Sequence, residues 1–243
     1  MRAIAAALLL SLSLSLNGCA GLDPGLLDAV LQGAQPRGGA LDEATVARGL
    51  REALRVGTER TVASTSRSGG FLLNQLIRIQ APEELTPMLR GLRAVGFGRQ
   101  VDELETAMNR AAERAASEAT DVFVGAIGRM TIADALGILR GGDTAATDYF
   151  REQTSDALVA RFTPIVDQKM REVGLYRIYQ ELSGAYAALP LARKPSLDLR
   201  AHVTDRAVAG LFTVLAQEET RIRQDPAART TELLRKVFAS GRR

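Results

Sequence analysis

Apolar residues recur at steps of three and four along most of the chain, the spacing that places side chains on one face of an α-helix. The first such stretch begins after Asp42 and contains Val46, Leu50, Ala53, Leu54 and Gly57. The same spacing predicts further helices over about 82–96, 99–130, 131–140, 143–173, 174–189, 199–223 and 225–238. We therefore expect an all-α fold, a bundle of about seven or eight helices in one domain over residues 41–240.

Several of the predicted helices begin at residues that can cap them. Asp42 and Asp143 are N-cap candidates, because a carboxylate accepts hydrogen bonds from the free amides of a first turn. Thr131 and Asp134 have the spacing of a capping box, in which each side chain bonds to the other residue's backbone amide. Asp225 precedes a proline, a pair that favours the start of the last predicted helix.

Residues 71–81 do not follow the helical spacing. Here Leu76, Arg78 and Gln80 alternate with Ile77, Ile79 and Ala81. Strict alternation is typical of a half-buried β-strand. The pattern is compatible with a short strand or hairpin arm near 71–81, and equally with a loop.

The N-terminus has the pattern of a secretory signal peptide. Arg2 precedes an uncharged run of Ala, Ile, Leu and Ser over residues 3–16, which is too short to cross a bilayer as a helix. The run ends in "LNGC" at residues 16–19, which resembles the bacterial lipobox. The resemblance implies cleavage before Cys19, the only cysteine, and attachment of fatty acyl chains, palmitate among them, to that residue.

These features divide the chain into three predicted parts. They are a lipoprotein signal peptide over 1–18, a lipidated cysteine with a Gly- and Pro-rich flexible tether over 19–40, and the helical domain. Ala20, rather than Asp, follows the cysteine, which by resemblance to Gram-negative lipoproteins favours the outer membrane, with the domain facing the periplasm.

Composition removes several classes of function. With a formal net charge of +3, the chain has no strong basic excess, so nucleic acid is not expected as a partner. His202 is the only histidine, and once Cys19 is acylated no thiol remains. Zinc sites need three or four His, Cys or carboxylate ligands, so we expect no metal site. We also find no cofactor motif and no catalytic motif, and we read His202 as a structural or surface residue.

Two groups of polar residues are candidate sites. Five residues of two long predicted helices would line a polar cleft if they faced one another: Asn109, Arg110, Glu113, Asp148 and Arg151. The alternative is that Asp143 caps a helix and that Asp148 and Arg151 lie on its exposed face. The second group is a structural ion pair, in which Arg229 returns to Glu218 or Glu219 and fixes the angle between the last two helices.

Five blocks of the sequence resemble the bacterial family known as domain of unknown function 4197. They are "GFLLNQLIRIQAPEEL", "MNRAAERAASEATDVFVGAI", "MTIADALGILRGGDTAATDYFREQTSDAL", "FTPIVDQKMREVGLYRIY" and "GLFTVLAQEETRIRQDPAARTTELLRKVF". The blocks occur in the family's order, and the resemblance covers about residues 41–238. The resemblance implies a mostly helical, signal-bearing bacterial protein, and it implies no activity or cofactor.

The sequence leaves three functions to compare. The first is a non-enzymatic, lipid-anchored module that binds another component of the bacterial envelope or scaffolds an assembly. The second is a carrier of an apolar ligand or lipid, held in a cavity beside the alanine-rich stripe 111–126. The third is a hydrolase that uses Asp, Glu and Arg, which would need carboxylates with raised pKa values in a concave cluster. The sequence does not indicate an oligomeric state.

Overall fold

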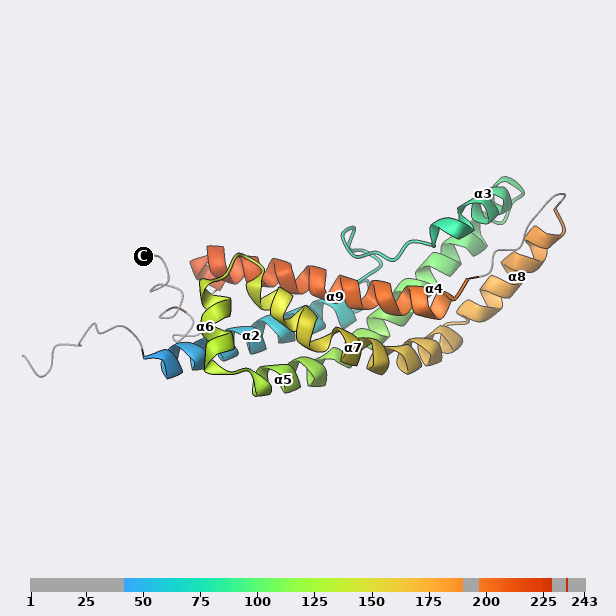
Figure 1. Cartoon of the computed structure of the whole chain (residues 1–243). Coiled ribbons are helices and arrows are strands. Elements are labelled where there is room, and N and C mark those ends of the chain that lie inside the picture. Colours follow the sequence, from blue (N-terminus) through green and yellow to red (C-terminus); the bar gives the residue numbers. More distant parts are fainter. Residues whose placement is uncertain (1–41, 190–196, 229–234, 236–243) are drawn as a thin grey trace, which may run out of the picture. The chain divides into compact units, whose positions relative to one another are not determined.

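A computed structural model describes residues 42–189, 197–228 and 235. All of them belong to one compact unit, Leu41–Arg243 (Figure 1). The predicted signal peptide, the lipidation site and the tether lie outside the described residues. So do Arg229 and most of the predicted last helix.

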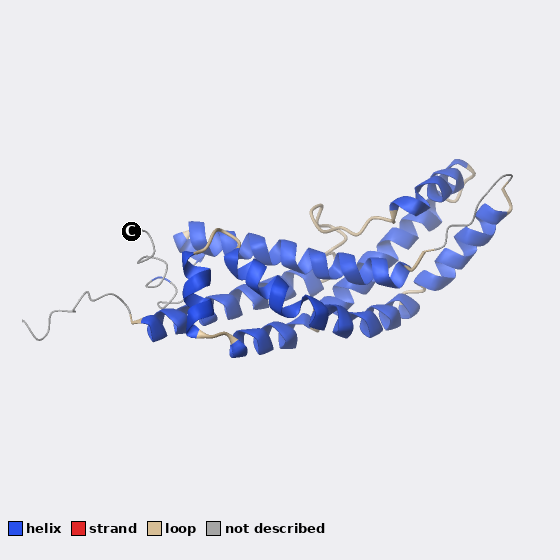
Figure 2. Cartoon of the chain, viewed as in Figure 1, coloured by secondary structure: helices blue, strands red, loops and turns tan. Residues whose placement is uncertain are grey.

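The described residues form eight α-helices and no strand (Figure 2), which confirms the all-α prediction. The helices are α2 (Glu43–Ser66), α3 (Thr86–Ala94), α4 (Gly98–Ala116), α5 (Ala119–Arg129), α6 (Ile132–Arg140), α7 (Ala145–Glu172), α8 (Leu175–Ala187) and α9 (Leu199–Gln224). Two 3₁₀ turns, η1 (Glu83–Leu85) and η2 (Pro226–Ala228), precede α3 and follow α9.

One hydrophobic core joins these helices. Helix α9 packs along α7 and α2, and α4 contacts α7, α8 and α9 (Figure 1). At the centre, the buried ring of Phe123 makes T-shaped contacts with Phe150 and Phe212, with centroids 5.6 and 6.3 Å away. Edge-to-face contacts of this kind are favourable beyond the apolar area that they bury.

Two of the predicted helix starts are confirmed. The Asp42 carboxylate accepts the Thr45 amide at 2.8 Å, and α2 begins at the next residue. The capping box at α6 is complete, since Thr131 accepts the Asp134 amide and the Asp134 carboxylate accepts the Thr131 amide. These hydrogen bonds from Thr131 hold the pKa of Asp134 below its ordinary value.

The single helix predicted over 99–130 is wrong, because the chain forms α4 and α5 with a break at Ser117 and Glu118. At the break the Glu118 amide bonds to the carbonyl three residues back, at 3.1 Å. The hydroxyls of Ser117 and Thr120 also bond to carbonyls three residues back, and such side-chain bonds compete with the helical pattern. The apolar spacing continues through this break, and no glycine or proline marks it. The sequence therefore contains no sign that the helix ends here.

Residues 67–82, which we call the α2–α3 segment, contain turns and extended chain instead of the strand considered for 71–81. The alternation is real, because Ile77 and Ile79 are buried while Arg78 and Gln80 are exposed. No strand of the described residues pairs with the segment. The alternation of apolar and polar residues therefore indicates an extended chain with one buried face.

The α2–α3 segment packs against the backbone of α9 at Gly210. A Cβ atom on Gly210 would lie 2.6 Å from the buried ring of Phe71 and 3.3 Å from the Cβ of Ile77. Only a residue without a side chain allows so close an approach of segment and helix.

We expect Gly210→Ala to lower the free energy of unfolding by about 1–3 kcal/mol, because the new methyl group displaces Phe71 and Ile77. Gly184→Ala is the matched control, since a Cβ there meets nothing within 4 Å and alanine favours the α8 interior. Urea unfolding of both variants checks the difference. Equal stabilities would show that the packing at Gly210 is loose.

Candidate functional site

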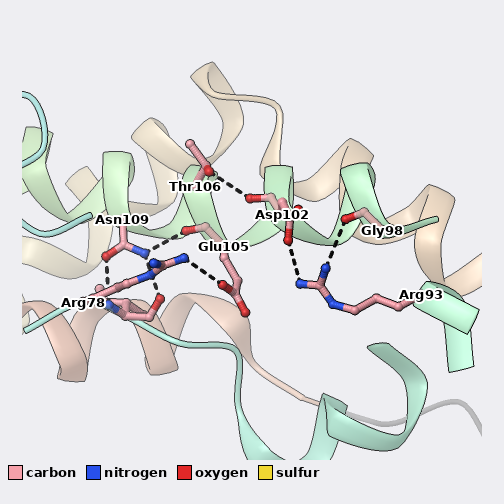
Figure 3. Close-up of polar contacts among 8 residues, drawn as sticks. Arg78, Arg93, Gly98, Asp102, Glu105, Thr106 and Asn109 are labelled. Atoms are coloured by element: carbon pink, nitrogen blue, oxygen red, sulfur yellow. Dashed lines mark hydrogen bonds and ion pairs between the residues drawn. The ribbon is translucent and has the colours of Figure 1, made fainter. Parts of the chain in front are cut away.

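The side chain of Asn109 holds the α2–α3 segment against α4 (Figure 3). Its Oδ1 accepts the Ile79 amide at 2.8 Å, and its Nδ2 donates to the Ile79 carbonyl at 2.8 Å. A third bond runs from Nδ2 to the Glu105 carbonyl at 2.8 Å. The side-chain amide of Asn109 therefore satisfies both the N–H and the carbonyl of Ile79, as a neighbouring β-strand would.

Glu113, one helical turn further along α4, holds the start of the segment. Its Oε1 accepts the backbone amides of both Phe71 and Leu72, at 3.1 Å each. The side chain is buried, and the two hydrogen bonds are charge-assisted. Asn109 and Glu113 thus fix the segment at two points eight residues apart in its sequence.

Between these two points the segment makes a tight turn that exposes leucines. Leu73 is 79% exposed and Leu76 is 67% exposed, the highest values among the large hydrophobic residues that the structure describes. The Leu73 amide bonds to the Gly69 carbonyl at 3.0 Å, and Asn74 Oδ1 accepts the Leu76 amide at 3.1 Å. These hydrogen bonds fix the backbone of the turn, and the fixed backbone holds the two leucine side chains in solvent.

A pocket between the α2–α3 segment, α3 and α4 is lined by arginines. Its volume is about 520 Å³, and Arg78, Arg90 and Arg93 line it together with Gln75 and Glu105. Arg78 pairs with Glu105 at 3.2 Å, and Arg93 pairs with Asp102 at 2.7 Å (Figure 3). Within the described part of the chain Arg90 has no ionic partner.

A second pocket, of about 420 Å³, lies on the α9 side of the same segment. His202 lines it, and its Nε2 lies 3.0 Å from the Gln80 carbonyl. Arg206, one turn along α9, shares this pocket with Glu83 and Glu84. The lone histidine thus contacts the backbone of the α2–α3 segment.

The five residues proposed for a polar cleft have different surroundings in the structure. Asn109 and Glu113 bind the α2–α3 segment, while Arg110 lines another pocket with Arg114 and Arg177. On α7, Asp148 accepts the Thr144 hydroxyl at 3.2 Å, and the Arg151 guanidinium lies 5.3 Å from the Phe212 ring centroid. No pocket found among the described residues contains all five.

Glu219 caps the N-terminus of α7 from the neighbouring helix α9. Its two carboxylate oxygens accept the amides of Ala146 and Thr147 at 2.9 and 2.8 Å, and the Thr147 hydroxyl adds a bond of 2.9 Å. The prediction that Asp143 caps this helix is wrong, because the N-cap is Thr144, which makes no side-chain capping bond.

Arg223 completes this contact, which joins three helices. Its Nη2 lies 2.8 Å from Glu219 Oε1 and 2.9 Å from the carbonyl of Ile138 in α6. Glu219 and Arg223 are both largely buried, with side-chain exposures of 7% and 11%. The predicted partner Arg229 lies outside the described residues, and Glu218 has Arg221 at 3.5 Å and Arg60 of α2 at 3.9 Å.

The described interior offers little space for a ligand. The apolar pocket lined by Leu50, Ala53 and Leu215 has a volume of about 20 Å³, whereas pockets for small molecules have about 300–1,000 Å³. The alanines of α4 at 111, 112, 115 and 116 are fully buried against neighbouring helices. No group of three or more His, Cys, Asp or Glu suited to a metal ion occurs in the part of the chain that the structure describes.

No single described helix has both the length and the apolar character to cross a bilayer. Helices α5 and α6 reach that length and apolar character only when they are taken together, and the pair is bent by 104°.

Comparison with protein families gives one match, to the family described as "Protein of unknown function (DUF4197)", over residues 40–239. Searches of the curated proteins and of the solved structures gave no match.

The two buried glutamates should respond differently to the same substitution. Glu113 uses one oxygen for both of its bonds, so Glu113→Gln keeps that acceptor and we expect a loss of less than about 1 kcal/mol. Glu219 uses both oxygens, so Glu219→Gln turns an amide N–H₂ toward a donor, and we expect a loss of about 2–4 kcal/mol.

Urea unfolding of both variants measures this contrast. Glu59→Gln is the control, because it removes one partner of an exposed ion pair with Arg55 and should change stability by less than about 1 kcal/mol. If Glu113→Gln proved as damaging as Glu219→Gln, the assignment of acceptors would be wrong.

Proposed function

Since this chain belongs to the DUF4197 family, whose description gives no activity, we propose a function from its own residues: a lipid-anchored binding module of the bacterial cell envelope. In this proposal the module acts by contact with another envelope component and not by catalysis. It faces the periplasm and is held at the outer membrane by acyl chains on Cys19.

The sequence at the N-terminus supports the anchor. The chain's single cysteine stands three positions after the end of the uncharged run, at the end of "LNGC". Each buried CH₂ of an acyl chain contributes roughly 0.8 kcal/mol, and two or more chains give a long-lived attachment.

The α2–α3 segment carries the binding part of the proposal. Its backbone is fixed by Asn109 and Glu113, and yet the turn between these contacts places Leu73 and Leu76 in solvent. Leaving two leucines exposed forgoes about 1.5–3 kcal/mol of burial for each. A rigid backbone that presents apolar side chains is suited to contact with a partner.

The carrier and the hydrolase have less support. The described apolar pocket is far smaller than a lipid needs, as described above. The two buried carboxylates at Glu113 and Glu219 are occupied by backbone amides, so neither points toward a substrate.

The anchor is tested by growing cells that express the protein with a labelled fatty acid. We expect the label on the wild-type protein and not on Cys19→Ser, which has lost the acceptor sulfur, and only the wild type should fractionate with the outer membrane. An unlabelled wild-type protein would contradict the proposed anchor.

The binding module is tested by a photo-crosslinking residue in place of Leu73. We expect crosslinks to an envelope component from this position and none from Val124, a control residue on α5 that is 48% exposed. If both positions gave the same pattern, the turn would have no special role in binding.

A further inference from the structure

We propose that the partner of the α2–α3 segment is the surface of an anionic phospholipid bilayer. Leu73 and Leu76 enter the boundary between headgroups and acyl chains, while nearby arginines face the lipid phosphates. The inference rests on the proposed function, because the anchor at Cys19 is what brings the module to a bilayer. It adds a second contact, which would fix the orientation of the module on the membrane.

Leu73 and Leu76 are the exposed large hydrophobic residues of the α2–α3 segment. The others among the described residues lie outside the segment: Val95, Val124, Ile132 and Val159. A specific protein interface buries about 800 Å² on each partner around an apolar core, which is much more than two leucines provide. A bilayer needs no matching surface and accepts isolated apolar side chains. The small size of this patch therefore favours lipid over protein.

The charge of the segment also favours an anionic surface. Residues 67–82 include Arg67 and Arg78 and no acidic residue. Arg67 is exposed and has no ionic partner within the described ranges, which is also true of Arg90 in the adjoining pocket. Glu105 lines the pocket with Arg90 and pairs with Arg78 at 3.2 Å, whereas Glu83 and Glu84 follow the segment and line the pocket on its other side. Arg67 belongs to the segment, and Arg90 shares a pocket with Gln75, which lies between the two leucines in sequence, so both are available to lipid phosphates beside the segment.

The rigidity of the backbone makes this contact favourable. A mobile loop loses conformational freedom when it docks, and that loss lowers its affinity. Here the backbone is already fixed by Glu113 at Phe71 and by Asn109 at Ile79. Gly210 admits Phe71 and Ile77 behind the turn, so the leucines cannot retreat into the core without displacing buried groups.

The test uses the full lipidated protein in vesicles. When Cys19 is acylated, Leu73→Cys has a single free thiol, to which a polarity-sensitive fluorophore is attached. The protein is reconstituted in phosphatidylcholine vesicles with and without phosphatidylglycerol. We expect a blue shift and shielding from an aqueous quencher with phosphatidylglycerol, whereas a fluorophore on Val124→Cys stays accessible in both.

Charge variants sharpen the result. We expect Arg67→Gln with Arg90→Gln to lower the ratio of docked to undocked protein by about tenfold or more, because each cation near an anionic surface contributes to binding. Arg140→Gln, on the exposed end of α6, is the control and should leave the ratio unchanged.

Two outcomes would overturn the inference. One is full quenching at residue 73 in phosphatidylglycerol vesicles, and the other is shielding that arises only after envelope proteins are added, which would identify a protein partner. Failure of the anchor is distinguishable, because an unacylated Cys19 would take a second fluorophore. That result would contradict the proposed anchor. The lipid contact of the turn would then be tested with the unlipidated protein in the same vesicles.

Discussion

The need of buried backbone amides for acceptors determines much of this structure. The first turn of any helix has amides without partners inside the helix, and a buried extended segment has the same need along its length. Three side chains meet this need from other helices: Glu219 for the start of α7, and Glu113 and Asn109 for the α2–α3 segment. Because Glu219 lies on α9 and the other two on α4, these acceptors also fix how the helices are placed around the core.

The sequence predicts those parts of the fold that depend on neighbours along the chain. Apolar spacing locates the helices, and the cap at Asp42 and the capping box at Thr131 follow from residues at most three positions apart. The break at Ser117 escapes prediction because serine and glutamate are compatible with a helix interior. The alternation at 77–80 correctly indicates one buried face, but it does not reveal that side chains of α4 take the place of a second strand.

The candidate site is less accessible to sequence reasoning, because its contacts join residues far apart. Glu113 bonds to amides 41 and 42 positions away, and Glu219 to amides 72 and 73 positions away. On a helix, a lone glutamate in a sequence is usually an exposed residue, so nothing local marks these two as buried. One signal was available: Asn109 and Glu113 lie one turn apart within the apolar stripe that contains Met108, Ala111 and Ala112, where polar residues need a partner.

These contacts also favour a function at the surface over one in the interior. Because alanine is small, it allows neighbouring helices to pack closely. The alanines of α4 are fully buried in such contacts and do not line a cavity. The buried polar groups of the same helix have their hydrogen-bonding capacity taken up by a segment that has no regular secondary structure. Exposed leucines contribute nothing to the free energy of folding. For stability alone, a shorter connection or buried leucines would be enough. The buried anchoring and the exposed turn are therefore consistent with one proposal, in which a rigid support presents a contact surface.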